Sequence, residues 1–242
     1  MRPRVHRVPD LSGSYRLLAH GAAVLRRRAI SADRAAAAAE RVRAAAAEWT
    51  TDFEGAQHSL GRAFYTHFET DRALAYFAQA EEADRVVERH LPGLQALMRS
   101  LFAEIVAGNA RQRRGYCGAG VHIFPSGGEL AARGGVVHYD VEGLTPLQLQ
   151  RRSPTLTLVL MLQPPARGGG LRLFDARFSG QEHPSDDDLC KDRVTVRYLA
   201  GDLLAMESYR LHQIRPFSPG RDRISATLHG VMVDRDVWDT WF

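Results

Sequence analysis

The chain has 242 residues, of which 45% are hydrophobic and 25% are charged. This length supports one sizeable core, and the charge content is too low for an intrinsically disordered chain. No apolar run approaches the roughly 18 residues of a membrane-spanning helix, and the early apolar stretch runs into Arg26-Arg27-Arg28, which is not typical of a signal peptide. Cys117 and Cys190 lie far apart, which excludes a disulfide framework and a CxxC zinc site. We therefore expect a cytoplasmic protein without a membrane segment.

The formal net charge is +4 and the isoelectric point is about 9.4, a balance that by itself suggests a nucleic-acid partner. Of the 32 basic residues, however, Lys191 is the only lysine, and the arginines are scattered among acidic residues. Scattered charge does not make the continuous positive surface that nucleic-acid binding requires. We expect no nucleic-acid partner.

Before about residue 110 the sequence patterns are helical. Ser31 is a favoured N-cap residue, and the alanine-rich stretch after it predicts a helix to about Trp49. Three further helical segments follow: residues 60–68, a helix from about Asp71 with Leu74, Phe77 and Ala78 at helical spacing, and a helix carrying Leu94, Leu97, Leu101 and Ile105 that ends at Gly108-Asn109. Residues 1–110 are thus predicted to form an N-terminal helical region that supports the rest of the chain.

After residue 110 the hydrophobic period changes to two, which is typical of strands. Short β-type runs, separated by glycine and proline clusters, occupy residues 120–124, 135–141, 155–162, 171–174, 194–199, 202–206, 212–215 and 223–233. The run 155–162 alternates leucine with other residues, so one face is expected to lie under helices and the threonine face to line a cavity. Eight short strands predict a β-sandwich or barrel over residues 111–242, and no linker divides the chain, so we expect one structural domain overall.

A candidate site begins at His138-Tyr139-Asp140. On a strand, residues i and i+2 point to the same face, so the imidazole and the carboxylate project together. His212 lies 72 residues after Asp140 at the start of another predicted strand. Two histidines and one carboxylate make the facial triad that binds non-haem iron(II) and leaves coordination positions open. The His-x-Asp pair alone also fits an ordinary surface ion pair.

Further motifs surround His212. The chain reads Ala200-Gly201-Asp202-Leu203, then His212-Gln213-Ile214-Arg215-Pro216-Phe217, then Gly220 and Arg223-Ile224-Ser225, and a glycine run at residues 168–170 precedes Leu171. This pattern resembles the Fe(II)/2-oxoglutarate-dependent dioxygenase superfamily, in its prolyl-4-hydroxylase-like branch, over about residues 115–233. The resemblance implies an α+β fold in which a double-stranded β-helix core, a jelly roll like that of cupins, carries the N-terminal helices packed on its major sheet.

The resemblance also implies roles for individual residues. His138, Asp140 and His212 match the iron ligands of the family. Arg223 matches the residue that binds the far carboxylate of 2-oxoglutarate, with Ser225 on the same face as a hydroxyl partner, because the planar guanidinium suits a carboxylate. Arg221 is the alternative anchor, since it lies two positions earlier.

Other residues are candidates for the pocket or for its surroundings. His122, Phe124, Val136 and Arg172 have positions compatible with a substrate pocket, although each also fits a structural or exposed role. His122 and His229 fall on predicted strands, where either could be a third metal ligand, as in cupin dioxygenases, or a hydrogen-bonded core group. Asp186-Asp187-Asp188 fits a lid or a solvated loop, and the aromatic residues Trp238, Trp241 and Phe242 are expected to dock on the core, with a dimer contact as the alternative.

The function implied by this resemblance is that of an Fe(II)- and 2-oxoglutarate-dependent dioxygenase using O2. Such an enzyme decarboxylates 2-oxoglutarate to succinate and CO2 and hydroxylates an unactivated C–H bond. We expect a small-molecule substrate, such as an amino acid or a biosynthetic intermediate, and a monomer or homodimer. Asp140 disfavours halogenation, whereas desaturation and cyclisation remain open. The alternatives are a peptidyl or protein side-chain hydroxylase of the prolyl-hydroxylase type and a non-catalytic metal-binding β-barrel.

Overall fold

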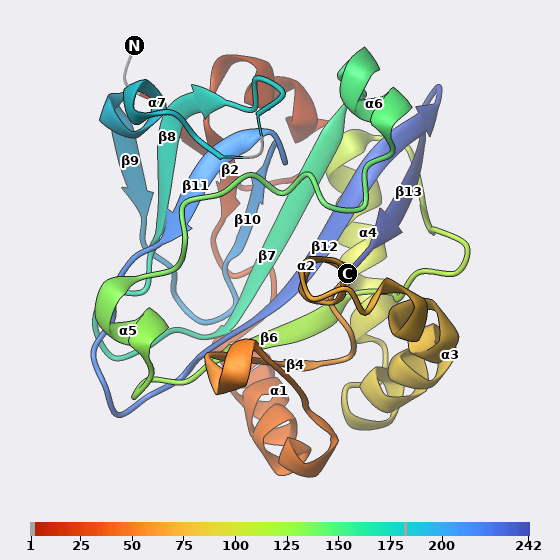
Figure 1. Ribbon diagram of the computed structural model, residues 1–242, viewed down its shortest axis with the longest axis vertical. Coiled ribbons are helices and arrows are strands. Elements are labelled where there is room, and N and C mark those ends of the chain that lie inside the picture. The colour runs from red at the N-terminus through yellow and green to blue at the C-terminus, as the bar shows by residue number, and fades with distance from the viewer. Residues whose placement is uncertain (1–2, 182) are drawn as a thin grey trace.

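The computed structural model describes residues 3–181 and 183–242, and its elements follow one another as shown in Figure 1. The helices are α1 (Ala32–Ala44), α2 (Phe64–Glu69), α3 (Ala73–His90), α4 (Leu94–Val106), α5 (Glu129–Arg133), α6 (Pro146–Arg151) and α7 (Asp186–Cys190). The strands are β1 (Val5–Arg7), β2 (Ala23–Arg26), β3 (Thr50–Asp52), β4 (Gln57–Leu60), β5 (Asn109–Gln112), β6 (Gly120–Phe124), β7 (Thr155–Gln163), β8 (Leu171–Arg177), β9 (Arg193–Val196), β10 (Leu203–Met206), β11 (Arg210–Ile214), β12 (Arg223–Asp234) and β13 (Val237–Trp241). No helix within the described ranges combines the length and the apolar character needed to cross a bilayer.

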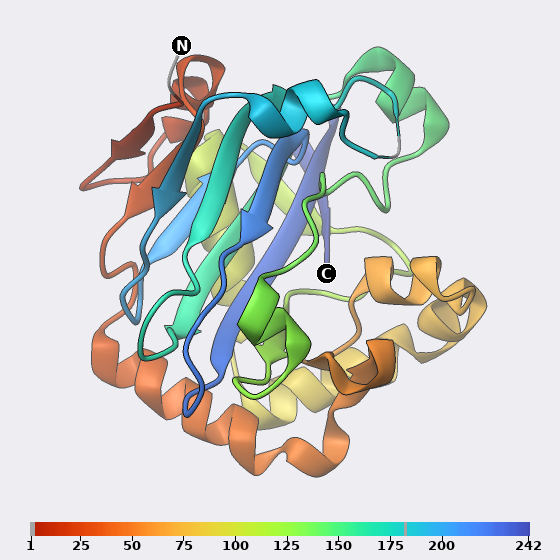
Figure 2. The ribbon, with the colours of Figure 1, turned by 60° about the vertical axis from the view of Figure 1, so that its left-hand side comes forward.

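The strands form two sheets. The larger sheet has the order β1-β2-β10-β7-β12-β6-β4-β3, with β13 pairing β12 and β5, and all its pairs are antiparallel except β1 with β2 and β13 with β5. The smaller sheet has the antiparallel order β11-β8-β9. In Figure 2 the smaller sheet, coloured teal to blue, lies in front of the larger one, and α4, coloured yellow, lies behind it. The chain is thus a mixed α/β protein built on a large, mostly antiparallel sheet.

The central strand β7 shows how the two faces of the large sheet are used. Leu156, Leu158, Leu160 and Leu162 belong to one buried cluster together with residues of α1 and α4. Val159 and Met161 point the other way and pack with residues of β8, β9 and β10. Because successive side chains of a strand alternate between faces, β7 joins the helical layer to the smaller sheet. This is the two-faced strand that the alternation over residues 155–162 predicted.

The region before residue 110 contains the predicted helices, but it also contains strands that the composition did not predict. Ser31 caps α1 through its side chain, as expected, although the α-helix ends at Ala44. Strands β1 to β4 all pair within the large sheet. They are only three or four residues long, too short to show an alternation in the sequence.

One other prediction about the elements was wrong, and the predicted helix from about Asp71 is present as α3 but with a different buried face. Residues 135–141 do not form a strand: they run beside β11 with only an isolated bridge between His138 and His212. Helix α3 buries Tyr76 and Ala80, whereas Leu74 is 87% exposed. This inward face packs in a buried cluster with Phe64, Trp241 and Phe242, and the Tyr76 hydroxyl also donates to the backbone carbonyl of Phe242 (3.3 Å), which ties α3 to the end of the chain.

Two further predictions concern residues 186–188, expected in a lid or a solvated loop, and the aromatic residues Trp238, Trp241 and Phe242. Residues 186–188 form the first turn of the short helix α7. The side chain of Ser185 caps the N-terminus of this helix in a capping box. Trp238, Trp241 and Phe242 are buried, so the expected docking of the terminal aromatic residues on the core is confirmed. Trp238 and Trp241 lie on β13, a strand that the sequence did not predict.

The turn at Ala200-Gly201-Asp202 has a structural role. Asp202 is fully buried; its carboxylate accepts hydrogen bonds from the backbone N–H groups of Leu199 (2.6 Å) and Arg28 (3.1 Å) and pairs with the Arg27 guanidinium. Gly201 has φ +84°, and a Cβ atom there would lie 2.2 Å from the carbonyl oxygen of Ile30. The turn therefore joins the start of β10 to the segment between β2 and α1.

Replacing Asp202 by alanine leaves two backbone donors and a guanidinium without their acceptor. We expect Asp202→Ala to lower the free energy of unfolding by about 2–4 kcal/mol, measured by urea denaturation. The control is Asp187→Ala, which removes an exposed carboxylate and should change stability by less than about 0.5 kcal/mol. Equal stability of the two variants would contradict this role.

Candidate metal centre

A cavity of about 570 Å³ lies where the two sheets meet the segment after α5. Its walls come from the large sheet (His122, Phe124, Thr157, Val159, Met206, Arg223, Ser225, Thr227 and His229), from the small sheet (Leu171, His212 and Ile214), and from two chain segments that cover its end (Phe53 to Glu69 and Glu129 to Glu142, in part). A cavity of this size is within the range of pockets that hold small molecules.

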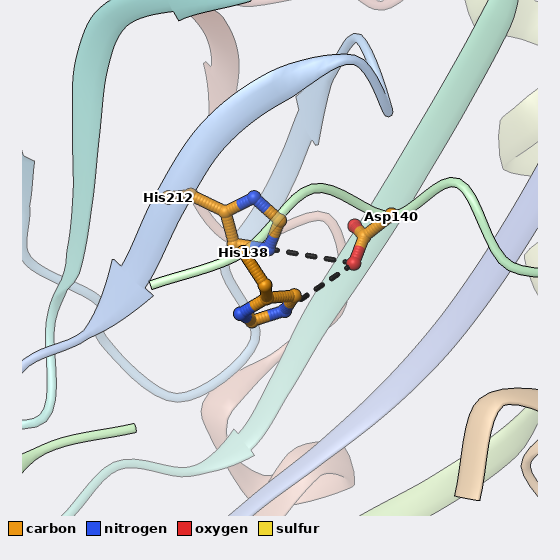
Figure 3. Close-up of side chains that lie close together, drawn as sticks. All are labelled: His138, Asp140 and His212. Atoms are coloured by element: carbon orange, nitrogen blue, oxygen red, sulfur yellow. Dashed lines mark ion pairs between the residues drawn. The ribbon is translucent and has the colours of Figure 1, made fainter. Parts of the chain in front are cut away.

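Three of the lining side chains converge on one point (Figure 3). His138 and Asp140 come from the segment after α5, and His212 comes from β11. The Nε2 atoms of His138 and His212 lie 3.5 and 3.4 Å from Oδ1 of Asp140, and one donor atom from each residue lies within 4.8 Å of the others. The backbone bridge between His138 and His212 brings the two histidines together, since each donates its N–H to the other's carbonyl at 3.0 Å.

Both imidazole rings are oriented by their own backbone. Nδ1 of His138 donates to the carbonyl of Val136 (2.9 Å), and Nδ1 of His212 donates to the carbonyl of Arg210 (2.8 Å). A proton held at Nδ1 leaves the lone pair of the neutral ring at Nε2, which faces Asp140. This is the outer hydrogen bond that accompanies most metal-ligating histidines. The donor set therefore fits a divalent transition metal, and two imidazoles with one carboxylate suit iron.

Asp140 is oriented from the opposite side. The Thr157 hydroxyl donates to Oδ2 of Asp140 at 2.8 Å, so Oδ1 is the oxygen left facing the histidines. Thr157 also contacts Ser208 Oγ (3.0 Å) and His229 Nδ1 (3.1 Å). The carboxylate is thus held in one rotamer by a strand of the large sheet.

The charges of the cluster shift the pKa values of its members. Desolvation alone would raise the pKa of Asp140, but the charge of His212 and hydrogen bonds from both histidines outweigh it and hold that pKa well below its usual range. Desolvation opposes protonation of His138, but the hydrogen bond and charge of Asp140 outweigh it and raise the pKa of His138 to about 9. A carboxylate that stays ionised next to two imidazoles is ready to bind a cation.

A buried arginine lies in the same cavity. Arg223 is only 2% exposed; its guanidinium donates to Ser225 Oγ (3.0 Å) and to the carbonyl of Gly169 (3.3 Å), and it lies 5.7 Å from the ring centroid of Tyr198. Among the described residues its neighbours are the Gly169 carbonyl, the Ser225 hydroxyl and Tyr198, with no carboxylate among them. A buried guanidinium without a counter-ion, beside the unpartnered hydroxyl of Tyr198, is suited to an anionic ligand. Arg221, in contrast, is exposed and donates to the carbonyl of Pro164 (2.8 Å).

Of the four residues predicted for the pocket, His122, Phe124 and Val136 line the cavity. Arg172 does not: on β8 its neighbours Leu171 and Leu173 point into the core, so Arg172 points outward and donates to Gln213 (3.2 Å). His229 lines the cavity, but its Nδ1 lies 4.0 Å from Asp140 and bonds Thr157, and neither His229 nor His122 belongs to the three-residue cluster.

Several residues that line or adjoin the cavity were not predicted from the sequence. Gln57 and Tyr65 line the cavity from β4 and α2, in a region that was predicted to be helical, and no motif marks them. Tyr198 lies two residues before the Ala-Gly-Asp turn, and its aromatic ring within a predicted strand was the only available signal.

No protein-family model matches the chain, and no curated protein matches it in sequence. Solved structures do match it. An N-substituted L-amino acid dioxygenase from Burkholderia ambifaria AMMD, in complex with α-ketoglutarate, is similar with a TM-score of 0.58 and 13% identity, over 95% of this chain and 90% of its own. The epimerase SnoN, in complex with Fe3+, α-ketoglutarate and nogalamycin RO, is similar with a TM-score of 0.56 and 18% identity, over 90% and 80% of the two chains.

A prolyl hydroxylase from Trichoplax adhaerens, in complex with a hypoxia inducible factor peptide fragment, has a TM-score of 0.50 and 13% identity, over 89% of this chain and 86% of its own. These likenesses show the fold of the 2-oxoglutarate- and Fe(II)-dependent oxygenases, as the motifs implied. The large antiparallel sheet is consistent with the jelly roll of these structures.

Metal binding at this cluster requires His138 without its Nε2 proton. Because the pKa of His138 is raised to about 9, a metal ion must displace a proton at every pH below that value. We expect the dissociation constant for Mn(II), measured by isothermal titration, to fall about tenfold per pH unit between pH 6.5 and 8.5 and to level off near pH 9. Titration in buffers of different ionisation enthalpy should show release of about one proton, and an affinity that does not change over this range would contradict the prediction.

Proposed function

We propose that this chain is an Fe(II)- and 2-oxoglutarate-dependent dioxygenase that hydroxylates an unactivated C–H bond of a small molecule. The observation that carries the proposal is the presence, in one cavity, of the His138–Asp140–His212 cluster and the buried Arg223 without a counter-ion. One cation site and one anion site in the same pocket are what a metal and a dicarboxylate require. In this proposal residues 111–242 form the double-stranded β-helix core, and residues 1–110 support it with helices packed on the major sheet.

The protein's own groups bind and orient the reactants. Nε2 of both histidines and Oδ1 of Asp140 hold the ion, and their orientation is maintained by the backbone carbonyls and by Thr157. The Arg223 guanidinium, positioned by Ser225, binds the far carboxylate of 2-oxoglutarate. Bound iron supplies the oxidising chemistry with O2, and 2-oxoglutarate is converted to succinate and CO2.

Apolar residues keep water away from the reacting groups. Val159, Leu171 and Met206 line the cavity and are buried, and Ile214 also lines it. A dry site strengthens the electrostatic interactions within it and protects a reactive oxidant from solvent. The protein thus contributes positioning and exclusion of water, and the bond-breaking chemistry belongs to the metal and its cosubstrate.

A small-molecule substrate is supported by two similar structures, the N-substituted L-amino acid dioxygenase and SnoN in complex with nogalamycin RO. The alternative, a peptidyl or protein side-chain hydroxylase, is supported by the prolyl hydroxylase with its peptide. Desaturation and cyclisation use the same cluster and are distinguished by the mass of the product. A non-catalytic metal-binding barrel is the outcome if the loaded protein forms no succinate.

The first test is binding of the two reactants under anaerobic conditions. With Fe(II) and 2-oxoglutarate the protein should develop a weak visible charge-transfer band, and His212→Ala should abolish it. On admission of O2 and candidate substrates, succinate release should accompany a product heavier by one oxygen atom. A protein that binds neither reactant would refute the proposed function.

The second test distinguishes Arg223 from Arg221 as the residue that binds 2-oxoglutarate. Arg223→Ala should raise the KM for 2-oxoglutarate by ~30-fold or more, because the charged partner of a buried carboxylate is removed, and Arg223→Lys should restore part of the loss. Arg221→Ala is the matched control, since the side chain is exposed, and its KM should stay within about twofold of the wild-type value. The opposite ranking would assign the anchor to Arg221.

A further inference from the structure

One histidine outside the metal cluster lines the cavity from strand β6. His122 is 6% exposed, and it pairs in register with Ser225 of β12 on one side and with Ser59 of β4 on the other. Its ring packs against those of Phe242 and Tyr65, with centroid distances of 4.6 and 5.7 Å. The imidazole is thus held in one position at the cavity wall.

A chain of two hydrogen bonds determines which ring nitrogen of His122 carries its proton. The Tyr65 hydroxyl donates to Oε1 of Gln57 (2.6 Å), and Nε2 of Gln57 donates to Nδ1 of His122 (3.1 Å). Burial raises the pKa of Tyr65, so its hydroxyl keeps the proton that it donates. Because the amide oxygen faces Tyr65, the amide group that faces the ring is the NH2 group, which only donates. Nδ1 is then an acceptor, and the proton of the neutral ring is on Nε2.

The Nε2–H group of His122 has no acceptor among the described residues. The two serines opposite it are engaged elsewhere, since Ser59 donates to the carbonyl of Gly61 (3.2 Å) and Ser225 accepts from Arg223 (3.0 Å). Nε2 is also not one of the polar atoms that are enclosed in the protein without a partner, so it is accessible from the cavity. Burial lowers the pKa of His122 to about 3, so this donor carries no charge at neutral pH.

The other charges of the cavity decide which acceptor suits this donor. Among the described residues, Arg223 is the one buried guanidinium that lines the cavity, and the proposed function assigns it to 2-oxoglutarate. Arg133 also lines the cavity, but it is exposed and paired with Glu129 at 2.8 Å. A second carboxylate, placed at His122, would be desolvated without a counter-ion of its own. A carbonyl oxygen needs only the single donor, and an ammonium group would meet a donor with a donor.

We propose that His122, positioned by Gln57 and Tyr65, donates its Nε2–H to a carbonyl oxygen of the substrate. The inference rests on the proposed function, because it concerns the substrate of that same cavity. It names carbonyl-bearing compounds, such as ketones, esters and amides, as the substrate class. His122 is then the residue that determines specificity, and Gln57 and Tyr65 are positioning residues that act through its ring.

The first measurement reads the tautomer of His122 in the full-length protein without metal. Long-range 1H–15N spectra at pH 7, assigned with His122→Phe, should show the proton of the wild-type ring on Nε2. In Tyr65→Phe the Gln57 amide is free to turn its oxygen toward the ring, so part of the population should carry the proton on Nδ1. A residue that merely fills the cavity wall would not change the tautomer.

Two outcomes of these spectra contradict the inference. A wild-type ring with its proton on Nδ1, or in the imidazolium form, would overturn the donor role of His122. A Tyr65→Phe protein with the proton still entirely on Nε2 would overturn the positioning role of Tyr65.

The second measurement compares acetophenone with α-methylstyrene, which has the same shape but a methylidene group in place of the carbonyl. The wild-type protein should bind acetophenone at least fivefold more tightly, with a shift of the His122 Nε2 signal, because one hydrogen bond is lost with the alkene. His122→Phe should remove this preference. His58→Phe is the matched control and should keep the preference, because His58 lies on β4 outside the cavity lining and contacts Thr51 (3.0 Å).

Benzoate tests whether the acceptor is uncharged. His122→Phe should weaken acetophenone binding about fivefold and leave benzoate binding within about twofold, because the carboxylate of benzoate is expected at Arg223. Benzoate binding that is weakened as much as that of acetophenone would assign an anionic group to His122 and overturn the carbonyl.

Equal binding of acetophenone and α-methylstyrene by the wild-type protein would overturn the inference, and this comparison depends on no variant. Its failure is distinguishable from failure of the proposed function. A protein that binds Fe(II) and 2-oxoglutarate but shows no preference for the ketone refutes only the carbonyl site. A protein that prefers the ketone at His122 but binds no iron refutes only the oxygenase.

Discussion

The site depends on the short backbone bridge between His138 and His212. Two reciprocal N–H···O=C bonds of 3.0 Å join a segment without regular structure to strand β11. Because the bridge places the two Cα atoms opposite each other, both imidazoles leave the backbone on the same side and can face Asp140 together. Two further backbone bonds, from Gly135 to Ile214 and from Asp140 to Ser208 (both 2.9 Å), hold the segment on either side of the bridge, so that the distances near 3.5 Å to the carboxylate are maintained.

Strands β7 and β12 of the large sheet position the other side chains of the site. Strand β7 places its leucines among the helices and leaves Thr157 on the cavity face, where the hydroxyl orients Asp140. Strand β12 places Arg223 and His229 on that same face, six residues apart, so the proposed anion-binding residue and a histidine of the cavity wall are built on one strand. Sites on strands hold their geometry better than sites on loops, since the sheet restrains every side chain.

The sequence predicted those parts of the molecule whose signal is local. The alternation in residues 120–124 and 155–162, the cap at Ser31, and the grouping of His138, Asp140 and His212 all follow from spacing within the chain or from a motif. The sequence did not predict that Gln57 and Tyr65 line the cavity. A strand of four residues and a helix of six residues bring them there through tertiary contacts alone, which leave no local signal. The segment 135–141 has the alternating pattern of a strand, but only the residues around His138 pair with another strand. The pattern therefore predicted a regular strand where only an isolated bridge forms.

Charge is distributed in the cavity so that each reactant has its own place. The ionised Asp140 attracts a cation at one point, and the buried Arg223 attracts an anion at another. Any further buried ion in the cavity would have to be desolvated without a partner, which costs several kcal/mol. Val159, Met206 and His122 also line the cavity, and they add no such charge, since two of them are apolar and burial lowers the pKa of His122 to about 3.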